Sequence, residues 1–150
     1  MLRLVPHRYP QLDLDAQLCF PLYATTRAVT RRYGELLAEV GLTYPQYLVL
    51  LTLWDAGEPL SVGRLGERLR LDSGTLTPLL KRLESAGLVV RRRDSSDERR
   101  VLVEPTPEGR ALRERVAHVP GELFASLSFS PTEAQQLRRL LAKVLDSVDG

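Results

Sequence analysis

The sequence predicts a mainly α-helical fold with one small β-hairpin, and three observations support this prediction. Apolar residues recur at helical spacing along most of the chain and form strand-like runs only within residues 88–103. Capping patterns divide the helical part into several segments. With 150 residues, of which 43% are hydrophobic and 27% charged, the chain suits a single globular domain spanning 1–150.

The N-terminal part is expected to contain an arm and one long helix. Residues 1–11 carry two prolines and no helical period, which predicts a poorly ordered arm. The helix begins near Leu18 and ends before Gly41. Pro21 is acceptable only in a first turn, so Cys19 should lie at the helix N-terminus. The apolar residues near one helix face are Leu18, Leu22, Val29, Tyr33, Leu36, Leu37 and Val40.

A second helix is predicted between Thr43 and Gly57. The segment Thr-Tyr-Pro-Gln that begins at Thr43 has the spacing of a capping box. The run from Tyr47 to Trp54 is apolar on nearly every side, so this helix should be buried in the core or in a subunit interface.

Two shorter helices follow, with Ser61 and Asp72 as their N-caps and Gly87 as the end of the second. The tight connection between them predicts a helix-turn-helix. Pro78 should either kink the second of these helices or shift its regular part toward the C-terminus. The apolar residues expected to face inward are Val62, Leu65 and Leu69, then Leu76, Leu79, Leu80 and Leu83.

After Gly87 the period changes to that of strands. The β-prone runs 88–90 and 101–103 flank a charged stretch, 91–100, and predict a hairpin with a mobile tip. A hairpin in this place is a wing, so residues 60–104 are expected to form a winged helix-turn-helix.

The C-terminal part should hold two more helices. One begins at Thr106 and is broken or bent at Pro120-Gly121; the other begins at Ser130, the first residue of a second capping box. We expect 12–57 and 106–149 to form a dimerisation region, with packing of the last helix on its own chain as the alternative. The apolar stripe of that helix comprises Leu137, Leu140, Leu141, Val144, Leu145 and Val148.

The net charge of +2 is too small to indicate a polyanion partner, but the charges are unevenly distributed. Between Arg64 and Arg100 there are ten basic and six acidic residues, against eleven and thirteen elsewhere. A solvated surface would explain this, but a helix-turn-helix with a wing explains it better, since both contact double-stranded DNA. The side chains expected to reach base edges or phosphates are Ser73, Thr75, Thr77, Lys81, Arg82, Arg91, Arg92, Arg93, Asp97, Arg99 and Arg100.

Two of these residues, Asp97 and Arg99, allow two interpretations. The carboxylate can orient the guanidinium toward a narrow minor groove. Alternatively, the two form an ordinary surface ion pair worth about 0–1 kcal/mol.

Composition excludes several other classes of protein. Cys19 has no partner cysteine in its chain, and two histidines, His7 and His118, do not make a metal site, so no metal or cofactor is expected. No membrane-spanning run or secretory signal is present, which predicts a cytoplasmic protein without membrane contact.

Three stretches resemble the MarR family, and specifically its OhrR branch of organic hydroperoxide sensors. They are Gln-Leu-Cys-Phe at 17–20, Leu-Thr-Tyr-Pro-Gln-Tyr-Leu at 42–48 and Leu-Asp-Ser-Gly-Thr-Leu-Thr-Pro at 71–78, and the wing contains Asp-Glu-Arg at 97–99. The resemblance covers about residues 12–149. Pro21 departs from the helix-forming residue more usual there.

The resemblance implies a homodimeric repressor that binds a pseudo-palindromic operator and is released when an organic hydroperoxide oxidises Cys19. It also implies that the hydroxyls of Tyr23 and Tyr33 support the thiolate across the dimer. Because no second cysteine is present, the chain resembles the one-cysteine subclass, in which a small cellular thiol would react after oxidation.

The chemistry of the residues agrees with this, because a helix N-terminus favours the thiolate form of a cysteine. A lone cysteine on an apolar helix is otherwise an inert buried residue. Two other functions remain open: release from DNA by a small aromatic ligand, or a thiol peroxidase. The peroxidase has no use for a basic wing, so we predict a regulator and not an enzyme.

Overall fold

The computed structural model describes residues 9–149, and it confirms a mainly helical fold with a small antiparallel sheet. Residues 1–8, which make up most of the expected arm, lie outside the described range. A short 3-10 turn, Pro10–Leu12, begins at the end of the arm, and a second turn, Leu14–Ala16, follows it. The helices are α1 (Cys19–Leu36), α2 (Tyr44–Ala56), α3 (Val62–Leu69), α4 (Ser73–Ser85), α5 (Pro107–Val116), α6 (Val119–Ala125) and α7 (Pro131–Val148). The strands are β1 (Leu60–Ser61), β2 (Val89–Arg93) and β3 (Val101–Pro105).

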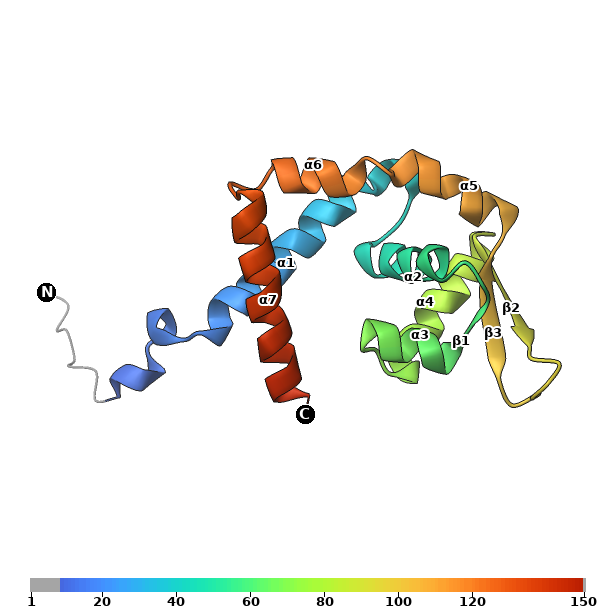
Figure 1. Ribbon diagram of the computed structural model, residues 1–150, viewed down its shortest axis with the longest axis horizontal. Helices are drawn as coiled ribbons and strands as arrows, with labels where there is room; N and C mark the ends of the chain where they lie inside the picture. The colour runs from blue at the N-terminus through green and yellow to red at the C-terminus, as the bar shows by residue number, and fades with distance from the viewer. Residues whose placement is uncertain (1–8, 150) are drawn as a thin grey trace, which may run out of the picture.

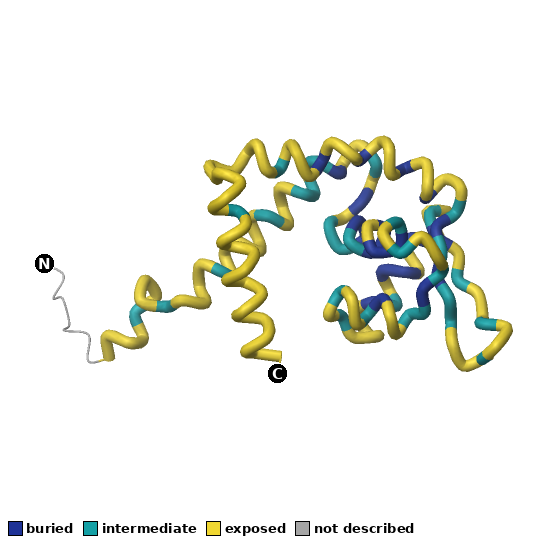
Figure 2. Tube along the Cα trace, viewed as in Figure 1, coloured by how far each residue is buried: buried dark blue, intermediate teal, exposed yellow. Residues whose placement is uncertain are grey.

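The elements form two parts, which Figure 1 shows side by side. Helices α2, α3 and α4 pack with the three strands into one compact unit. Helices α1, α6 and α7 extend away from it, and α5 leads from the sheet back toward them. Buried residues concentrate in the compact unit and continue along α5 to the first residue of α6, whereas α1 and α7 contain none (Figure 2).

The core of the compact unit comes from all of its elements. Leucines of α2, α3 and α4 pack together on one face of the sheet, and Val103 of β3 lies among them. Helix α2 is the most deeply buried helix, as its apolar run predicts. It lies within residues 12–57, which were expected to contribute to dimerisation, but within the chain it packs against α3, α4 and β3 of the compact unit. The indole Nε1 of Trp54 donates a hydrogen bond of 3.0 Å to the carbonyl of Gly109, which joins α2 to α5.

The sheet contains a strand that the sequence analysis did not predict. Its order is β1-β3-β2, so the two residues of β1 pair with β3 and turn the expected hairpin into a three-stranded sheet. In the register of the hairpin itself, Val89 lies opposite Pro105 and Arg93 opposite Val101. The strand β2 therefore includes the first three arginines of the stretch that was expected to be the hairpin tip.

The capping residues predicted from the sequence occupy their expected places. The side chain of Ser61 accepts a hydrogen bond from the Arg64 amide, and that of Asp72 accepts one from the Thr75 amide. Both capping boxes are complete, at Thr43 with Gln46 and at Ser130 with Glu133. Such side chains satisfy amides that a first helical turn leaves without partners, which is why the helices begin where they do.

Three details of the helices differ from the expectation. Helix α1 ends at Leu36, and a 3-10 turn, Ala38–Val40, separates it from the left-handed Gly41, whose φ is 68°. Pro78 stays inside α4, where it removes the amide that would bond to the carbonyl of Gly74. The break after α5 falls at residues 117–118, and Pro120 lies in the first turn of α6, where a proline needs no amide partner.

Candidate DNA interface and redox site

Helix α4 presents its polar residues on the side away from the core. Its leucines Leu76, Leu80 and Leu83 are fully buried. Ser73, Thr75, Lys81 and Arg82 are exposed and Thr77 is half-buried, so all five predicted contact residues on this helix lie at or near its surface. A helix exposed in this way can enter the major groove, which is about 12 Å wide.

The turn that precedes α4 fixes how the two helices of the helix-turn-helix meet. Arg70 has a φ of 53° and is the one non-glycine residue of positive φ between residues 9 and 149. The amide of Leu71 donates a hydrogen bond of 2.9 Å to the carbonyl of Gly66, and a side chain on Gly66 would lie 2.7 Å from the Leu71 carbonyl oxygen. The Arg70 guanidinium also donates to a carboxylate oxygen of Asp149, beyond the end of α7, at 2.5 Å.

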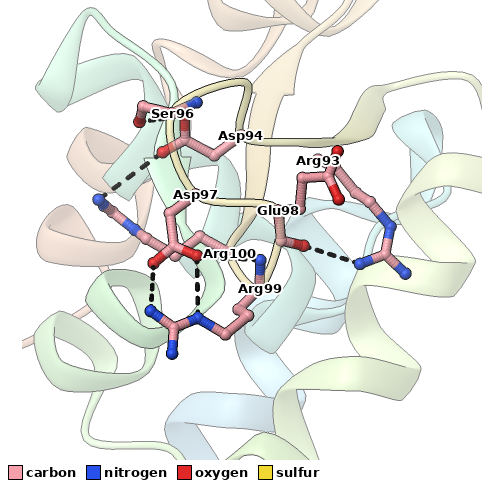
Figure 3. A network of polar contacts seen from close by, with 7 residues as sticks. All are labelled: Arg93, Asp94, Ser96, Asp97, Glu98, Arg99 and Arg100. Atoms are coloured by element: carbon pink, nitrogen blue, oxygen red, sulfur yellow. Dashed lines mark hydrogen bonds and ion pairs between the residues drawn. The ribbon is translucent and has the colours of Figure 1, made fainter.

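Polar contacts link the residues of the wing tip to one another (Figure 3). Asp94 accepts hydrogen bonds from the amide of Ser96, at 2.9 Å, and from its hydroxyl, at 2.7 Å. These two bonds, helped by the nearby Arg100, lower the pKa of Asp94. The Arg93 guanidinium donates to the carbonyl of Glu98 across the turn. The turn at the tip of the wing is therefore closed by hydrogen bonds from its own side chains.

Arg99 projects farthest from this turn, with 91% of its side chain exposed. Its Nε and Nη2 donate to the two carboxylate oxygens of Asp97, at 3.1 and 3.4 Å. These hydrogen bonds lower the pKa of Asp97, so its carboxylate is ionised throughout the neutral range. Since a pair this exposed adds little to stability, its effect is to orient the guanidinium.

The other predicted wing arginines have acidic or carbonyl partners as well. Arg92 pairs with Glu104 at 3.1 Å, and Arg100 lies 3.7 Å from Asp94. Arg91 pairs with Glu84 of α4 at 2.6 Å. An open depression of about 460 Å³ lies between α3, α4 and the wing, and the residues lining it include Thr77, Arg91, Arg99 and Arg100. The structure thus brings Thr77 of α4 and three arginines of the hairpin to one depression.

We expect Arg99→Ala to weaken operator binding and to reduce its salt dependence, because the exposed guanidinium can neutralise a phosphate or enter the minor groove. The slope of log K against log salt should fall by about 0.9 in magnitude for one lost phosphate contact. Asp97→Ala, the matched control, should weaken binding less and leave the slope unchanged. Fluorescence anisotropy across a salt series measures both. An unchanged affinity of Arg99→Ala would show that the wing does not contact DNA.

Cys19 is the first residue of α1, and its side chain is exposed in the single chain. Tyr23 lies one turn further along α1 and is 61% exposed. Arg27, a turn beyond that, donates from Nη1 to the Tyr23 hydroxyl at 3.5 Å, with its guanidinium 5.7 Å from the ring centroid. The thiol, the phenol and the guanidinium therefore follow one another along one side of the helix.

Tyr33 lies near the other end of α1 and stacks on Tyr44 of α2, with ring centroids 4.0 Å apart and 10° between the planes. Tyr47 completes the cluster at 5.9 Å from Tyr33. Burial, with a smaller effect of the two neighbouring phenols, raises the pKa of Tyr33 to about 12. Its hydroxyl therefore keeps its proton at neutral pH and remains a hydrogen-bond donor.

The structure does not bring Tyr33 and Cys19 of one chain together. They are fourteen positions apart on one helix, which is about 21 Å along the helix axis. A hydrogen bond between them requires a second copy of the chain. Tyr44, which was not among the residues predicted for the redox site, lies beside Tyr33. It belongs to the segment 42–48 that resembles the OhrR branch.

A winged helix-turn-helix with an exposed polar helix and a wing tipped by arginine defines a DNA-binding transcriptional regulator, and comparison with known proteins agrees. The family described as transcriptional regulator SarA/Rot matches residues 31–116. The organic hydroperoxide resistance transcriptional regulator of Bacillus subtilis is 43% identical over 95% of this chain and 96% of its own length. The chain belongs to the MarR family of transcriptional regulators, and within it is similar to the OhrR type, as its motifs predict.

Solved structures extend the likeness to the fold. Reduced AbfR bound to DNA, a protein of Staphylococcus epidermidis, is 36% identical with a TM-score of 0.80, covering 93% of this chain and 94% of its own. BpsR of Bordetella bronchiseptica, whose DNA binding is regulated by 6-hydroxynicotinic acid, is 26% identical with a TM-score of 0.81, over 89% and 96% of the two chains. These relatives are regulators, which confirms the prediction that this chain is not an enzyme. None of the helices between residues 9 and 149 could cross a membrane.

Proposed function

We propose that this protein is a homodimeric repressor that leaves its operator when an organic hydroperoxide oxidises Cys19. The observation on which this depends is the exposed thiol at the first residue of α1, in a chain similar to an organic hydroperoxide resistance regulator. AbfR, a second relative, has been solved in reduced, overoxidised and disulfide forms, so a protein of this fold can undergo oxidation.

The dimer is supported by apolar surface that one chain leaves uncovered. The stripe along α7 is exposed, with Leu140 at 58% and Val148 at 75%, and Leu18 near the start of α1 is 78% exposed. Surfaces this apolar normally mark an interface. Two-fold symmetry of the protein would match a pseudo-palindromic operator, each copy placing one α4 and one wing on a half-site. Sedimentation equilibrium should accordingly give the mass of two chains.

In such a dimer the tyrosines of one copy can reach the thiol of the other. The Tyr33 hydroxyl is a protonated donor, and Tyr44 lies against it. Hydrogen bonds from these groups, together with Tyr23, favour the thiolate, which is the nucleophile toward peroxide. The thiolate attacks the terminal peroxide oxygen and the O–O bond breaks, which leaves the sulfenic acid of Cys19. The alkoxide that departs takes up a proton from water and becomes an alcohol.

We expect the sulfenic acid to condense with a small cellular thiol, because a disulfide within the chain is impossible with one cysteine. An S–S bond forms, and the sulfenic oxygen leaves as water. Intact-mass spectra after peroxide and a small thiol should show one adduct per chain, reversed by reductant with recovery of DNA binding. Cys19→Ser should show no adduct. A covalent dimer as the main product on non-reducing gels would contradict this step.

A gel-shift titration tests the function as a whole. The duplex is the DNA upstream of the protein's own gene, and the reduced protein is titrated with and without an organic hydroperoxide. Binding that is lost with peroxide and restored by reductant supports the proposal. Binding that peroxide does not affect would refute peroxide sensing while leaving DNA binding intact.

Release by a small aromatic acid is the second candidate, and one depression favours it. It has a volume of about 330 Å³ between α2 and α5, and its lining includes Tyr47, Leu51, Trp54 and Arg113. BpsR shows that a protein of this fold can respond to an aromatic acid. Release by such a ligand without oxidant, and in Cys19→Ser as well, would decide for this candidate.

A further inference from the structure

One ion pair joins the recognition helix to the wing. Glu84 lies in the last turn of α4, and Arg91 is the third residue of β2. The guanidinium of Arg91 donates from Nε and Nη2 to Oε2 of Glu84, at 2.9 and 2.6 Å. The backbone amide of Arg91 donates to Oε1 of the same carboxylate at 3.2 Å. Both oxygens of one carboxylate are therefore bound to one residue of the neighbouring element.

The position of Arg91 explains why its amide is available. β2 is an edge strand, paired on one side with β3 and unpaired on the other. The outward amides of an edge strand need partners, and the Glu84 carboxylate supplies one. The Arg91 side chain is 26% exposed, against 91% for Arg99 at the wing tip, so water competes less for its guanidinium. The same hydrogen bonds lower the pKa of Glu84.

The other ion pairs of the wing have a different role. Arg92 pairs with Glu104 between β2 and β3, and Arg99 pairs with Asp97 within the tip. Both pairs lie within the hairpin, so neither fixes its angle to α4. The Glu84–Arg91 contacts cross the connection between α4 and β2, so they resist rotation of the hairpin about that connection.

We propose that Glu84 and Arg91 form a clamp that fixes the wing relative to the recognition helix, so that the two engage neighbouring grooves of an operator as one rigid unit. Arg91 is then a positioning residue and not the direct DNA contact that the sequence predicted. The inference rests on the DNA-binding part of the proposed function and is independent of the oxidation of Cys19.

Glu84→Gln gives the sharpest test, because the two possible roles predict opposite results. Loss of a negative charge beside DNA should strengthen binding or leave it unchanged if only charge matters. Loss of the charge-assisted clamp should instead weaken operator binding by about tenfold. Binding to a non-operator duplex should change little. Such binding depends on contacts to phosphates that do not require one fixed position of the wing. A variant that had merely lost its fold would lose both kinds of binding.

The control is Glu104→Gln, which removes the same charge from the pair inside the hairpin and should not weaken operator binding. Arg91→Gln should weaken operator binding as Glu84→Gln does, with an unchanged slope of log K against log salt. Operator binding by Glu84→Gln that equals or exceeds the unaltered affinity would overturn the clamp. A slope lowered by about 0.9 in Arg91→Gln would also overturn it, because that change marks a lost phosphate contact.

Hydrogen exchange of the DNA-free protein tests the clamp without any operator. Glu84→Gln should speed exchange of the Arg91 amide and of the wing, and leave α2 and α3 as protected as before. Equal protection of the wing in both proteins would refute the clamp. If the reduced, unaltered protein binds no operator, the proposed function fails, and the exchange result alone then decides on the clamp.

Discussion

Cys19→Ser is expected to bind its operator like the unaltered chain and to stay bound at every hydroperoxide concentration that releases the unaltered protein. Serine keeps the size and hydrogen bonding of the side chain but has no thiolate to attack the O–O bond. Cys19 is exposed at the start of α1, so the exchange disturbs no packing within the chain. Gel shifts of the reduced and peroxide-treated proteins measure the difference.

A matched control is Thr25→Ser, a change of similar size at an exposed position on the same helix. It should respond to hydroperoxide like the unaltered chain. Addition of salt should release Cys19→Ser from DNA, which would show that its persistence under peroxide is not simply irreversible binding. Release of Cys19→Ser by hydroperoxide would end the sensing proposal, since the chain has no other cysteine.

Gly109→Ala is expected to lower the free energy of unfolding by about 3 kcal/mol. A Cβ at this position would overlap the carbonyl oxygen of Leu88 and lie 3.0 Å from its carbonyl carbon. Both atoms are backbone, so no side chain can rotate out of the way. The Leu88 carbonyl is itself fixed, because it accepts a hydrogen bond from the amide of Thr106.

Hydrogen bonds also hold the backbone of Gly109 in place, which leaves the structure around it little freedom to relax. Its amide donates to the Thr106 hydroxyl and its carbonyl accepts from Trp54 of α2. Gly63→Ala in α3 is the control, because nothing lies within 4 Å of the added carbon, and it should stabilise by about 0.5 kcal/mol. Urea unfolding followed by circular dichroism, at one fixed protein concentration, measures both changes. A loss below about 1 kcal/mol in Gly109→Ala would contradict the rigidity of this junction.

The sequence by itself determined where most helices begin and which class of protein the chain belongs to. Ser61, Asp72 and Ser130 cap their helices as predicted, and Cys19 begins α1. These features depend on contacts within three or four residues, which local sequence specifies. The motifs that indicated a MarR-type regulator are also short local stretches, and the relatives confirm them.

Features that depend on distant residues were decided only by the tertiary structure. The two-residue strand β1 has no period of its own and forms because β3 offers it an edge. The sequence places Arg91, Arg92 and Arg99 together in one basic run, but the fold gives each a different carboxylate. The stack of Tyr33 on Tyr44 likewise depends on how α1 turns back toward α2. Pairings of this kind follow from how closely the elements approach, and chain composition does not specify that approach.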